Sequence, residues 1–293
     1  MAAPRTPISL GTWPTPLEPA PRLAAALGLD ELWIKRDDLT GLGGGGNKVR
    51  KLQHLCALAL EAGATTLVTT GAAQSNHARL TAAAAARLGL ACTLVLRGDP
   101  PGTHRGNLLL DELAGATIVW AGDAPLGEVA AAQEGYVIPF GGTSPVSARG
   151  YVDCAAELLT QLPDLAAVVV ALGSGGTMAG LVAGLGPHRV YGVDTGALSA
   201  PRAAVASLLD GMGAAVDPAA LQIDDSQVGA GYAELTDSVR SALVLAARTE
   251  GLFLDPTYTG RALAGLRANP PDGKVVFLHS GGLPGLFGHP ALA

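Results

Sequence analysis

Residues 65–97 read TTLVTTGAAQSNHARLTAAAAARLGLACTLVLR, and this stretch decides the expected fold. Two short runs rich in β-branched residues, TTLVTT and ACTLVLR, flank an alanine-rich segment of helical length. A strand, a helix and a second strand in this order form a parallel pair, because the crossover helix carries the chain back to the starting end of the sheet. The stretch therefore predicts a βαβ unit.

The same alternation continues along the chain. The further expected helices are 105–115, 150–162 and 176–186, and the further expected strands are 116–120, 166–172, 189–194 and 274–280. This pattern is typical of α/β proteins with open, twisted, mainly parallel sheets flanked by helices. The glycine stretches GLGGGG and FGGTS flank the run 50–140. We therefore expect a small α/β domain, 50–140, inserted in a larger domain made of 1–49 and 141–293.

The composition excludes several classes of protein. Lys and Arg total 19 against 25 Asp and Glu, a net charge of −6, and there is no dense basic run, which disfavours nucleic acid as a partner. Cys56, Cys92 and Cys154 form no C-x-x-C pair and the histidines are scattered, so we expect neither a disulfide framework nor a metal site. The first 21 residues hold six prolines and no apolar signal-peptide core, which favours a cytoplasmic protein.

One uncharged segment, LAAVVVALGSGGTMAGLVAGLGP (165–187), is long enough to suggest a membrane helix. Its glycines indicate otherwise. Gly173, Gly175 and Gly176, together with Ser174 and Thr177, interrupt the segment after a β-branched run. Such an interruption is typical of a buried strand, a turn and a helix. We therefore expect no membrane span here.

The turn 173–177 is a candidate phosphate site. Free backbone N–H groups and the positive end of the helix dipole at the start of the following helix would bind a phosphate, and small residues would let the ligand come close to the backbone. The alternative interpretation is a tight strand-to-helix turn that needs glycine for its backbone alone.

A second glycine-rich stretch, TGLGGGGNKVRKLQ (40–53), resembles two familiar nucleotide motifs without fitting either. Gly41, Gly43 and Gly46 have the spacing of a dinucleotide-binding loop, but the preceding WIKRDDLT carries four charges in succession, so a buried strand leading into the first glycine is not expected. A Walker loop has Gly before its lysine and Ser or Thr after it, whereas Asn47 precedes Lys48 and Val49 follows it.

Lys48 instead begins a segment of helical length. A lysine is unreactive at its reference pKa of roughly 10.4, but in a desolvated site it forms a Schiff base with a carbonyl group. The alternative is a solvated lysine, which is how we interpret Lys51. A phosphate cradle, a lysine and hydroxyl-bearing strand ends without a metal-ligand cluster together favour a pyridoxal phosphate site.

The segment Ser75, Asn76 and His77 opens another expected helix. Ser75 suits the capping position, and the N–H groups beside it would face a substrate carboxylate. The alternative is simple capping. A hydrolytic pair of Ser75 and His77 is disfavoured, because residues two apart on a helix do not face each other.

Five motifs together resemble one known family: GGNKVRKL (45–52), GAAQSNHAR (71–79), GSGGT (173–177), LDPTYTGRA (254–262) and HSGGLPGLF (279–287). They are similar, in this order and over most of the chain, to the D-cysteine desulfhydrase and 1-aminocyclopropane-1-carboxylate deaminase family. The resemblance implies a fold-type II pyridoxal phosphate enzyme, related to the β-subunit of tryptophan synthase and expected to be a homodimer.

The resemblance also implies roles for single residues. Lys48 would bind the cofactor aldehyde and then act as the base at the substrate α-carbon. Ser75, Asn76 and His77 would line the substrate side, with Ser75 as a catalytic residue near the reacting group and Asn76 near the hydroxyl of the cofactor ring. The cofactor phosphate would be held by Gly173, Ser174, Gly175, Gly176 and Thr177. Tyr258 would lie over the ring or assist the leaving group, Tyr232 resembles a second such tyrosine, and Thr259 and Ser280 are candidates for the neighbour of the pyridine nitrogen.

The expected activity is a pyridoxal 5'-phosphate-dependent elimination on a small amino acid, D-cysteine or another β-substituted alanine, that gives pyruvate, ammonia and sulfide. Deamination of 1-aminocyclopropane-1-carboxylate is the alternative within the family. An inactive homologue that only binds the cofactor is the alternative outside enzymes. The stretch 97–135 is shorter than is usual in the family, so the resemblance leaves the substrate loop undefined.

Overall fold

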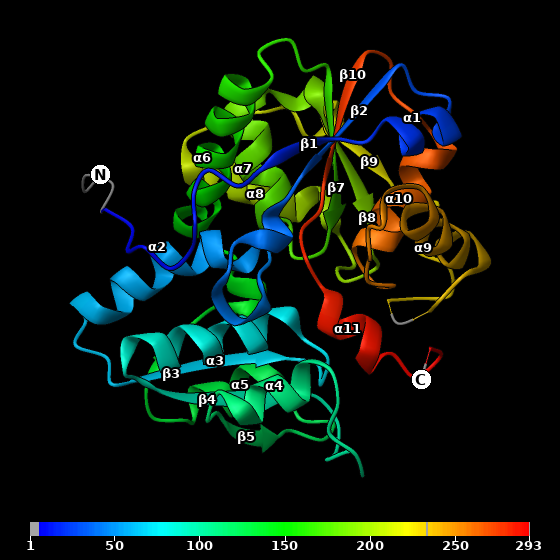
Figure 1. The fold of residues 1–293 in the computed structure, drawn as a ribbon. Coiled ribbons are helices and arrows are strands. Elements are labelled where there is room, and N and C mark those ends of the chain that lie inside the picture. Colours follow the sequence, from blue (N-terminus) through cyan, green and yellow to red (C-terminus); the bar gives the residue numbers. More distant parts are fainter. Residues whose placement is uncertain (1–5, 233, 293) are drawn as a thin grey trace.

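A six-stranded sheet and a four-stranded sheet form the frame of the molecule (Figure 1). The computed structural model describes residues 6–232 and 234–292. The larger sheet has the order β1 (Leu17–Pro19), β2 (Glu31–Lys35), β10 (Lys274–Leu278), β7 (Ala167–Leu172), β8 (Val190–Asp194) and β9 (Gln222–Asp224). The smaller sheet has the order β5 (Thr117–Trp120), β4 (Ala91–Leu96), β3 (Thr66–Gly71) and β6 (Tyr136–Val137). All pairs are parallel except β1 with β2.

Helices cover both faces of each sheet (Figure 1). One face of the larger sheet packs on α1 (Pro21–Leu27), α9 (Asp237–Glu250) and α10 (Thr259–Ala268), and the other packs on α6 (Pro145–Gln161), α7 (Gly176–Leu185) and α8 (Pro201–Met212). The smaller sheet packs on α2 (Lys48–Glu61), α3 (Asn76–Leu88) and α4 (Asn107–Leu113) on one face, and on α5 (Leu126–Ala131) on the other. The predicted α/β class is confirmed. A last helix, α11 (Leu283–Gly288), contacts α4.

Local sequence explains where the elements begin and end. Strand β7 is buried along its whole length, which suits its run of valines. Helix α3 begins after Ser75, whose hydroxyl accepts a hydrogen bond from Ala78 N, and it ends at Gly89 in the left-handed conformation. Helix α6 begins at Pro145, earlier than the predicted residue 150, because Ser144 and Ser147 form a capping box.

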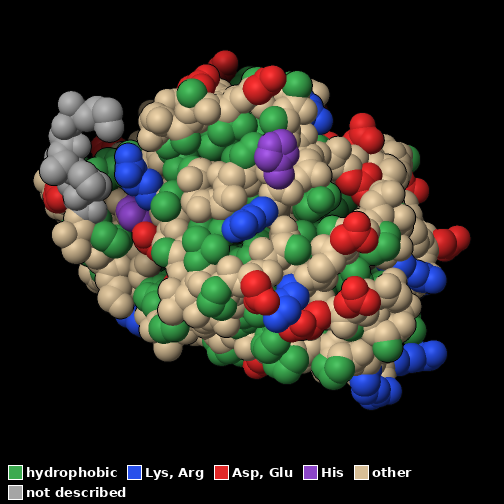
Figure 2. Space-filling view, turned by 90° about the horizontal axis from the view of Figure 1, so that it is seen from above, with side chains coloured by type: hydrophobic (Ala, Val, Ile, Leu, Met, Phe, Trp, Pro, Cys, Tyr) green, Lys and Arg blue, Asp and Glu red, His purple; other side chains and the backbone are tan. Residues whose placement is uncertain are grey.

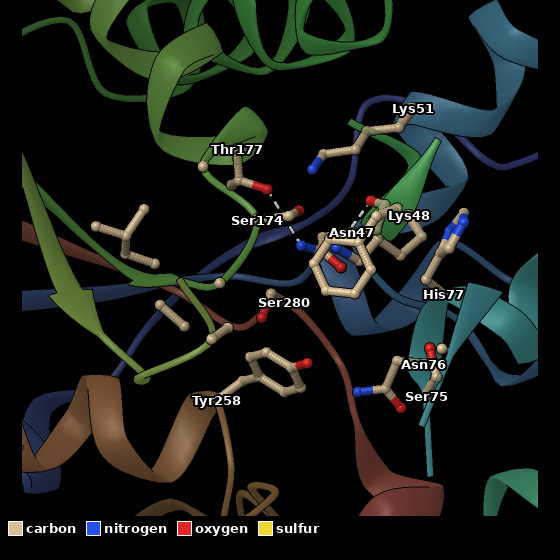
Figure 3. Close-up of a pocket in the computed structure, with 18 of the residues that line it drawn as sticks. Asn47, Lys48, Lys51, Ser75, Asn76, His77, Ser174, Thr177, Tyr258 and Ser280 are labelled. Carbon is tan, nitrogen blue, oxygen red and sulfur yellow. Dashed lines mark hydrogen bonds between the residues drawn. The ribbon is translucent and has the colours of Figure 1, made fainter. Parts of the chain in front are cut away.

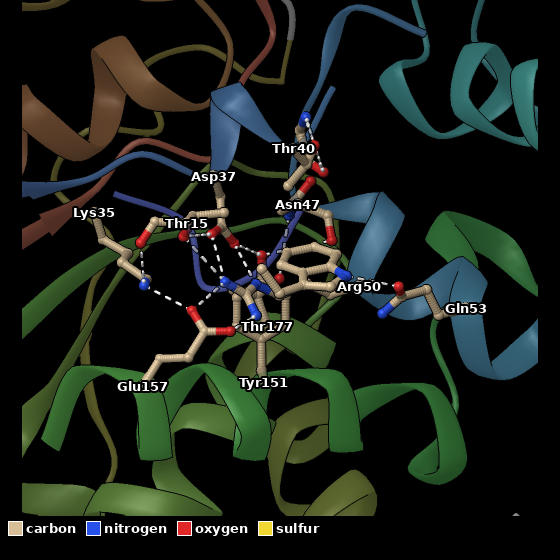
Figure 4. Close-up of polar contacts among 12 residues, drawn as sticks. Thr15, Lys35, Asp37, Thr40, Asn47, Arg50, Gln53, Tyr151, Glu157 and Thr177 are labelled. Carbon is tan, nitrogen blue, oxygen red and sulfur yellow. Dashed lines mark hydrogen bonds and ion pairs between the residues drawn. The ribbon is translucent and has the colours of Figure 1, made fainter. Parts of the chain in front are cut away.

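The short strands β1, β2, β6 and β9 were not predicted from the sequence, and β2 is the instructive one. We expected no buried strand leading from the charged stretch WIKRDDLT into Gly41, and β2, which pairs in parallel with β10, ends at Lys35. The Lys35 side chain is fully buried, and its amine donates to Thr15 O at 2.9 Å and to Glu157 Oε2 at 2.7 Å (Figure 4). A buried charge is tolerated when it is paired and hydrogen-bonded. The strand still stops well before Gly41, so the stretch does not form a dinucleotide-binding turn.

A buried ion pair fixes the start of α2 in the fold (Figure 4). The Arg50 guanidinium donates to both oxygens of Asp37 at 2.9 Å and to Glu157 Oε1 at 2.8 Å, and it lies 4.2 Å from the centre of the Trp13 ring. Burial alone would raise the pKa of Asp37, but Arg50 outweighs it and holds that pKa below its usual range. Because Arg50 lies two residues after Lys48, this network also sets the position of Lys48.

The strands between residues 66 and 137 make up the smaller sheet, and the remaining strands make up the larger one. The exact domain boundaries, 49/50 and 140/141, stay a prediction. None of the helices in residues 6–232 and 234–292 has the length and apolar character needed to cross a membrane. Figure 2 shows acidic and basic side chains mixed over one face of the molecule.

Candidate active site

A cavity of about 300 Å³ opens where the ends of strands from both sheets meet (Figure 3). Its walls come from the turn after β3, the turn after β7, the start of α2 and the segment after β10. Ligands of open α/β sheets bind at the carboxyl ends of the strands. Most of the predicted site residues line this cavity, and Gly176 and Thr259 are the two that do not. Those that line it are Lys48, Ser75, Asn76, His77, Gly173, Ser174, Gly175, Thr177, Tyr232, Tyr258 and Ser280.

Lys48 lies at the first position of α2 and lines the cavity. Its amine donates to Gly141 O at 3.2 Å. Burial lowers the pKa of Lys48 to about 8, although its contact with Lys51 opposes this shift. A lysine with this pKa is partly unprotonated at neutral pH, so it is able to react with a carbonyl group.

The glycines before Lys48 let the chain pass through a narrow space. Gly45 has φ +74°, and a Cβ atom there would lie 1.8 Å from Asp38 O. A Cβ atom on Gly46 would lie 3.2 Å from Ser280 O. Arg79 on α3 donates to Gly43 O and, at 3.1 Å, to Gly45 O. The glycines are therefore required by close backbone packing around the lysine.

Our interpretation of Lys51 as a solvated lysine is wrong. Its side chain is buried, lines the cavity and donates to Thr143 Oγ1 at 3.0 Å. Burial, followed by the charge of Lys48, lowers its pKa well below the usual value. The three-residue spacing between Lys48 and Lys51 could have indicated this position, because residues three apart share one face of a helix.

The turn 173–177 has the geometry of an anion site (Figure 3). Gly175 is left-handed, with φ +85°, and precedes α7 without a capping side chain, so the first N–H groups of α7 have no cap. Hydroxyl groups surround the turn: Ser174 Oγ lies 2.6 Å from Thr143 Oγ1, and Asn47 Nδ2 donates to Thr177 Oγ1 at 3.1 Å. Helix N–H groups and lysine are suited to a phosphate.

Gly176 supports this interpretation although it does not line the cavity. A Cβ atom at this position would lie 2.9 Å from Lys51 Nζ and 3.0 Å from Thr143 Cγ2. Only glycine lets the start of α7 approach the lysine this closely. The residues present therefore fit a phosphorylated ligand.

Ser75, Asn76 and His77 line the cavity at the start of α3, and the ring of His77 is also hydrogen-bonded to Thr69 of β3. Thr69 donates its hydroxyl to Ile138 O at 3.0 Å, so His77 Nε2, 2.8 Å from the same hydroxyl oxygen, donates to it. Burial and the charges of Lys48 and Lys51 lower the pKa of His77 well below the usual value. His77 is thus a neutral side chain bonded to Thr69.

The structure separates the two candidates for the neighbour of the pyridine nitrogen. Ser280 lines the cavity. Thr259 is fully buried beside Asp255: its hydroxyl donates to Asp255 Oδ1 at 2.7 Å and accepts from Asp255 N at 2.8 Å. Thr259 therefore supports the start of α10, and Ser280 is the better placed candidate.

Tyr258 and Tyr232 line the side of the cavity opposite the start of α2 (Figure 3 shows Tyr258). Their hydroxyl groups are hydrogen-bonded to each other. Burial raises the pKa of Tyr258 well above its usual value, and Tyr232 adds to this. Tyr258 therefore stays protonated at neutral pH.

A family model described as "Pyridoxal-phosphate dependent enzyme" matches residues 8–281. The chain belongs to the pyridoxal-phosphate dependent enzyme family. Among curated members, the D-cysteine desulfhydrases of Salmonella schwarzengrund (strain CVM19633) and Salmonella typhi are each 42% identical to this chain, over an alignment 311 positions long that covers 94% of this chain and 94% of the relative.

Solved structures of other proteins share this fold. An ACC deaminase homologue superposes with a TM-score of 0.86 at 36% identity and covers 96% of this chain and 93% of its own. The processed form of threonine deaminase isoform 2 from Solanum lycopersicum superposes with a TM-score of 0.67 at 21% identity, over 92% of this chain and 79% of its own, and shares the fold. The predicted fold type and the predicted cofactor, pyridoxal phosphate, are confirmed.

Proposed function

We propose that this chain catalyses the elimination of a small β-substituted amino acid, D-cysteine first among them. For cysteine the balance is one cysteine and one water giving pyruvate, ammonia and hydrogen sulfide. The observation that carries the proposal is the cavity itself, in which Lys48, with its pKa lowered to about 8, lies across from a protonated tyrosine pair. The 42% identity to D-cysteine desulfhydrases supports the choice of substrate.

In this proposal the turn 173–177 and Lys51 would hold the phosphate, Lys48 would bind the aldehyde, and Ser280 would be the neighbour of the ring nitrogen. When bound, pyridoxal phosphate supplies the electron sink that makes removal of the α-proton possible. The protein contributes position and proton transfer.

Lys48 Nζ accepts the α-proton of the substrate. The bond from the β-carbon to sulfur then breaks, its electron pair leaves with the sulfur, and Tyr258 donates a proton to the departing thiolate. The backbone N–H groups beside Ser75, at the start of α3, bind the substrate carboxylate, because the first turn of a helix presents N–H groups and a positive dipole end.

Deamination of 1-aminocyclopropane-1-carboxylate is the second candidate, and the likeness to an ACC deaminase homologue supports it. No Asp or Glu among the described residues lines the cavity. A hydroxyl group such as that of Ser280 stabilises a protonated pyridine nitrogen less than a carboxylate would. Elimination tolerates a weakly stabilised pyridine nitrogen better than ring opening does. In elimination the departing thiolate removes the electron pair, whereas ring opening of the cyclopropane has no such leaving group. An inactive cofactor-binding homologue is disfavoured by the retained Lys48, Ser75 and Tyr258.

One assay separates these candidates. Keto-acid release is measured on purified protein with D- and L-cysteine, D- and L-serine, β-chloroalanine and 1-aminocyclopropane-1-carboxylate. We expect pyruvate from D-cysteine or β-chloroalanine well above 2-oxobutyrate from the cyclopropane. Equal or faster 2-oxobutyrate release would favour the deaminase, and no keto acid from any substrate would favour the inactive homologue.

Borohydride reduction tests the lysine independently of turnover. Reduction should fix the cofactor on the peptide that contains Lys48, and the Lys48→Arg variant should lose the label. A label on Lys51 would contradict the assignment.

The family resemblance also supports a cytoplasmic homodimer. Light scattering on the purified protein tests the dimer, and fractionation of the source cells tests the location.

A further inference from the structure

Asn107 lies outside the cavity but contacts one of its walls. It is fully buried at the start of α4 and does not line the cavity. Its Nδ2 donates to Gln74 O at 2.9 Å and to Asn76 Oδ1 at 3.0 Å. It therefore joins α4 to Asn76 of α3, which lines the cavity.

The orientation of both amides follows from a backbone group. The backbone carbonyl oxygen of Gln74 only accepts hydrogen bonds, so the side-chain atom of Asn107 that contacts it is the nitrogen, Nδ2. The second hydrogen of that nitrogen is directed at the Asn76 side chain, so the Asn76 atom that receives it is the oxygen. The side-chain nitrogen of Asn76 therefore faces the cavity.

Gln74 holds the arrangement from the other side. Its Oε1 accepts from the backbone N–H of Asn107 at 2.9 Å, and its Nε2 donates to Arg105 O at 2.9 Å. A Cβ atom on Gly106 would lie 2.4 Å from Gln74 Oε1, and one on Gly288 would lie 2.1 Å from it. Reversal of any amide would place donor against donor or acceptor against acceptor.

We propose that Asn107 is a positioning residue: it holds the Asn76 amide so that its nitrogen, and not its oxygen, faces the bound ligand. Asn76 Nδ2 then donates to an oxygen of the ligand, such as the ring hydroxyl of the cofactor. Figure 3 shows the nitrogen of Asn76 on the side of Tyr258. The inference rests on the proposed function for the identity of that ligand.

The Asn107→Asp variant tests whether Asn107 orients the Asn76 amide. Aspartate has nearly the same shape but no donor, so Asn76 rotates to donate to it and presents its oxygen to the cavity. We expect the dissociation constant for pyridoxal 5'-phosphate, titrated by absorbance on the apoprotein, to rise about tenfold or more. The control Asn269→Asp places the same charge at an exposed helix end and should leave the constant unchanged.

A double-mutant cycle separates positioning from a structural role. In an Asn76→Ala background, Asn107→Asp should cause no further loss of cofactor affinity, although any effect on thermal unfolding should remain. If Asn107→Asp does not fold, Asn107→Ala replaces it, with the same expectations. A folded Asn107 variant with unchanged affinity, or an equal loss in both backgrounds, would overturn the inference. Failure of the unmodified protein to bind the cofactor would overturn the proposed function.

Discussion

The hydroxyl groups of Tyr232 and Tyr258 are hydrogen-bonded at the cavity wall, with their ring centres 5.9 Å apart and their planes inclined by 74°. The two residues come from different segments, one before α9 and the other at the start of α10. Because both hydroxyls have raised pKa values, chiefly through burial, the pair is uncharged at neutral pH. The pair therefore does not act as a base at neutral pH, and each hydroxyl keeps its proton.

The Tyr258→Phe variant removes the proposed proton donor. We expect kcat to fall about a hundredfold for cysteine, since a general acid contributes on the order of 10² to 10⁴. The loss should be much smaller for β-chloroalanine, whose chloride needs no proton. Steady-state kinetics with both substrates measure this, and Tyr136→Phe, in the other sheet, is the control. Equal losses for the two substrates would contradict the role.

Lys48 should make cofactor attachment depend on pH. Its pKa of about 8 means that the protonated, unreactive form dominates below pH 8. The rate of covalent attachment to the apoprotein should therefore rise about tenfold for each pH unit and level off above pH 8. Stopped-flow absorbance measures the rate. If the midpoint of the curve of rate against pH lay near the ordinary lysine pKa of roughly 10.4, the lowered pKa of Lys48 would be refuted.

Gly176→Val should lower the affinity for the cofactor more than it lowers kcat measured at saturating cofactor. The valine side chain at the start of α7 would clash with Lys51 Nζ and with the side chain of Thr143, because even a Cβ atom at position 176 has no room. We expect affinity to fall at least about tenfold, because the phosphate would lose backbone N–H groups. Gly127→Val is the matched control, since a Cβ atom there meets nothing within 4 Å. Unchanged affinity in a folded Gly176 variant would place the phosphate elsewhere.

Asp111 should make stability depend on pH. Neither carboxylate oxygen has a hydrogen-bond partner among the described residues, and burial raises its pKa from 3.8 to about 8, against the attraction of Arg79. The folded state binds the proton more tightly, so the stabilising contribution is complete below pH 3.8 and is lost as the pH rises towards 8. Between about pH 5 and pH 9, the stability of Asp111→Asn relative to the parent should increase by at least about 2 kcal/mol, measured by urea unfolding. Asp272→Asn, an exposed control, should show no such gain.

Local sequence was sufficient for much of the fold. Strands β3, β4 and β7 and helices α3 and α7 follow from apolar periodicity and from residues that begin or end helices, such as Ser75 and Gly175. These features act between neighbours in the chain, so the sequence displays them directly.

Other features depend on partners far along the chain. Lys35 is buried in β2 because Glu157, 122 residues away, pairs with it. Lys51 is buried because Thr143 and the start of α7 close over it, and Thr259 turns away from the cavity because Asp255 receives its hydroxyl. Sequence alone determined the main alternation of strands and helices and pointed to the candidate residues for the chemistry. Only the tertiary structure decided which polar side chains face the cavity, because the burial of a charge or a hydroxyl depends on partners that folding brings together.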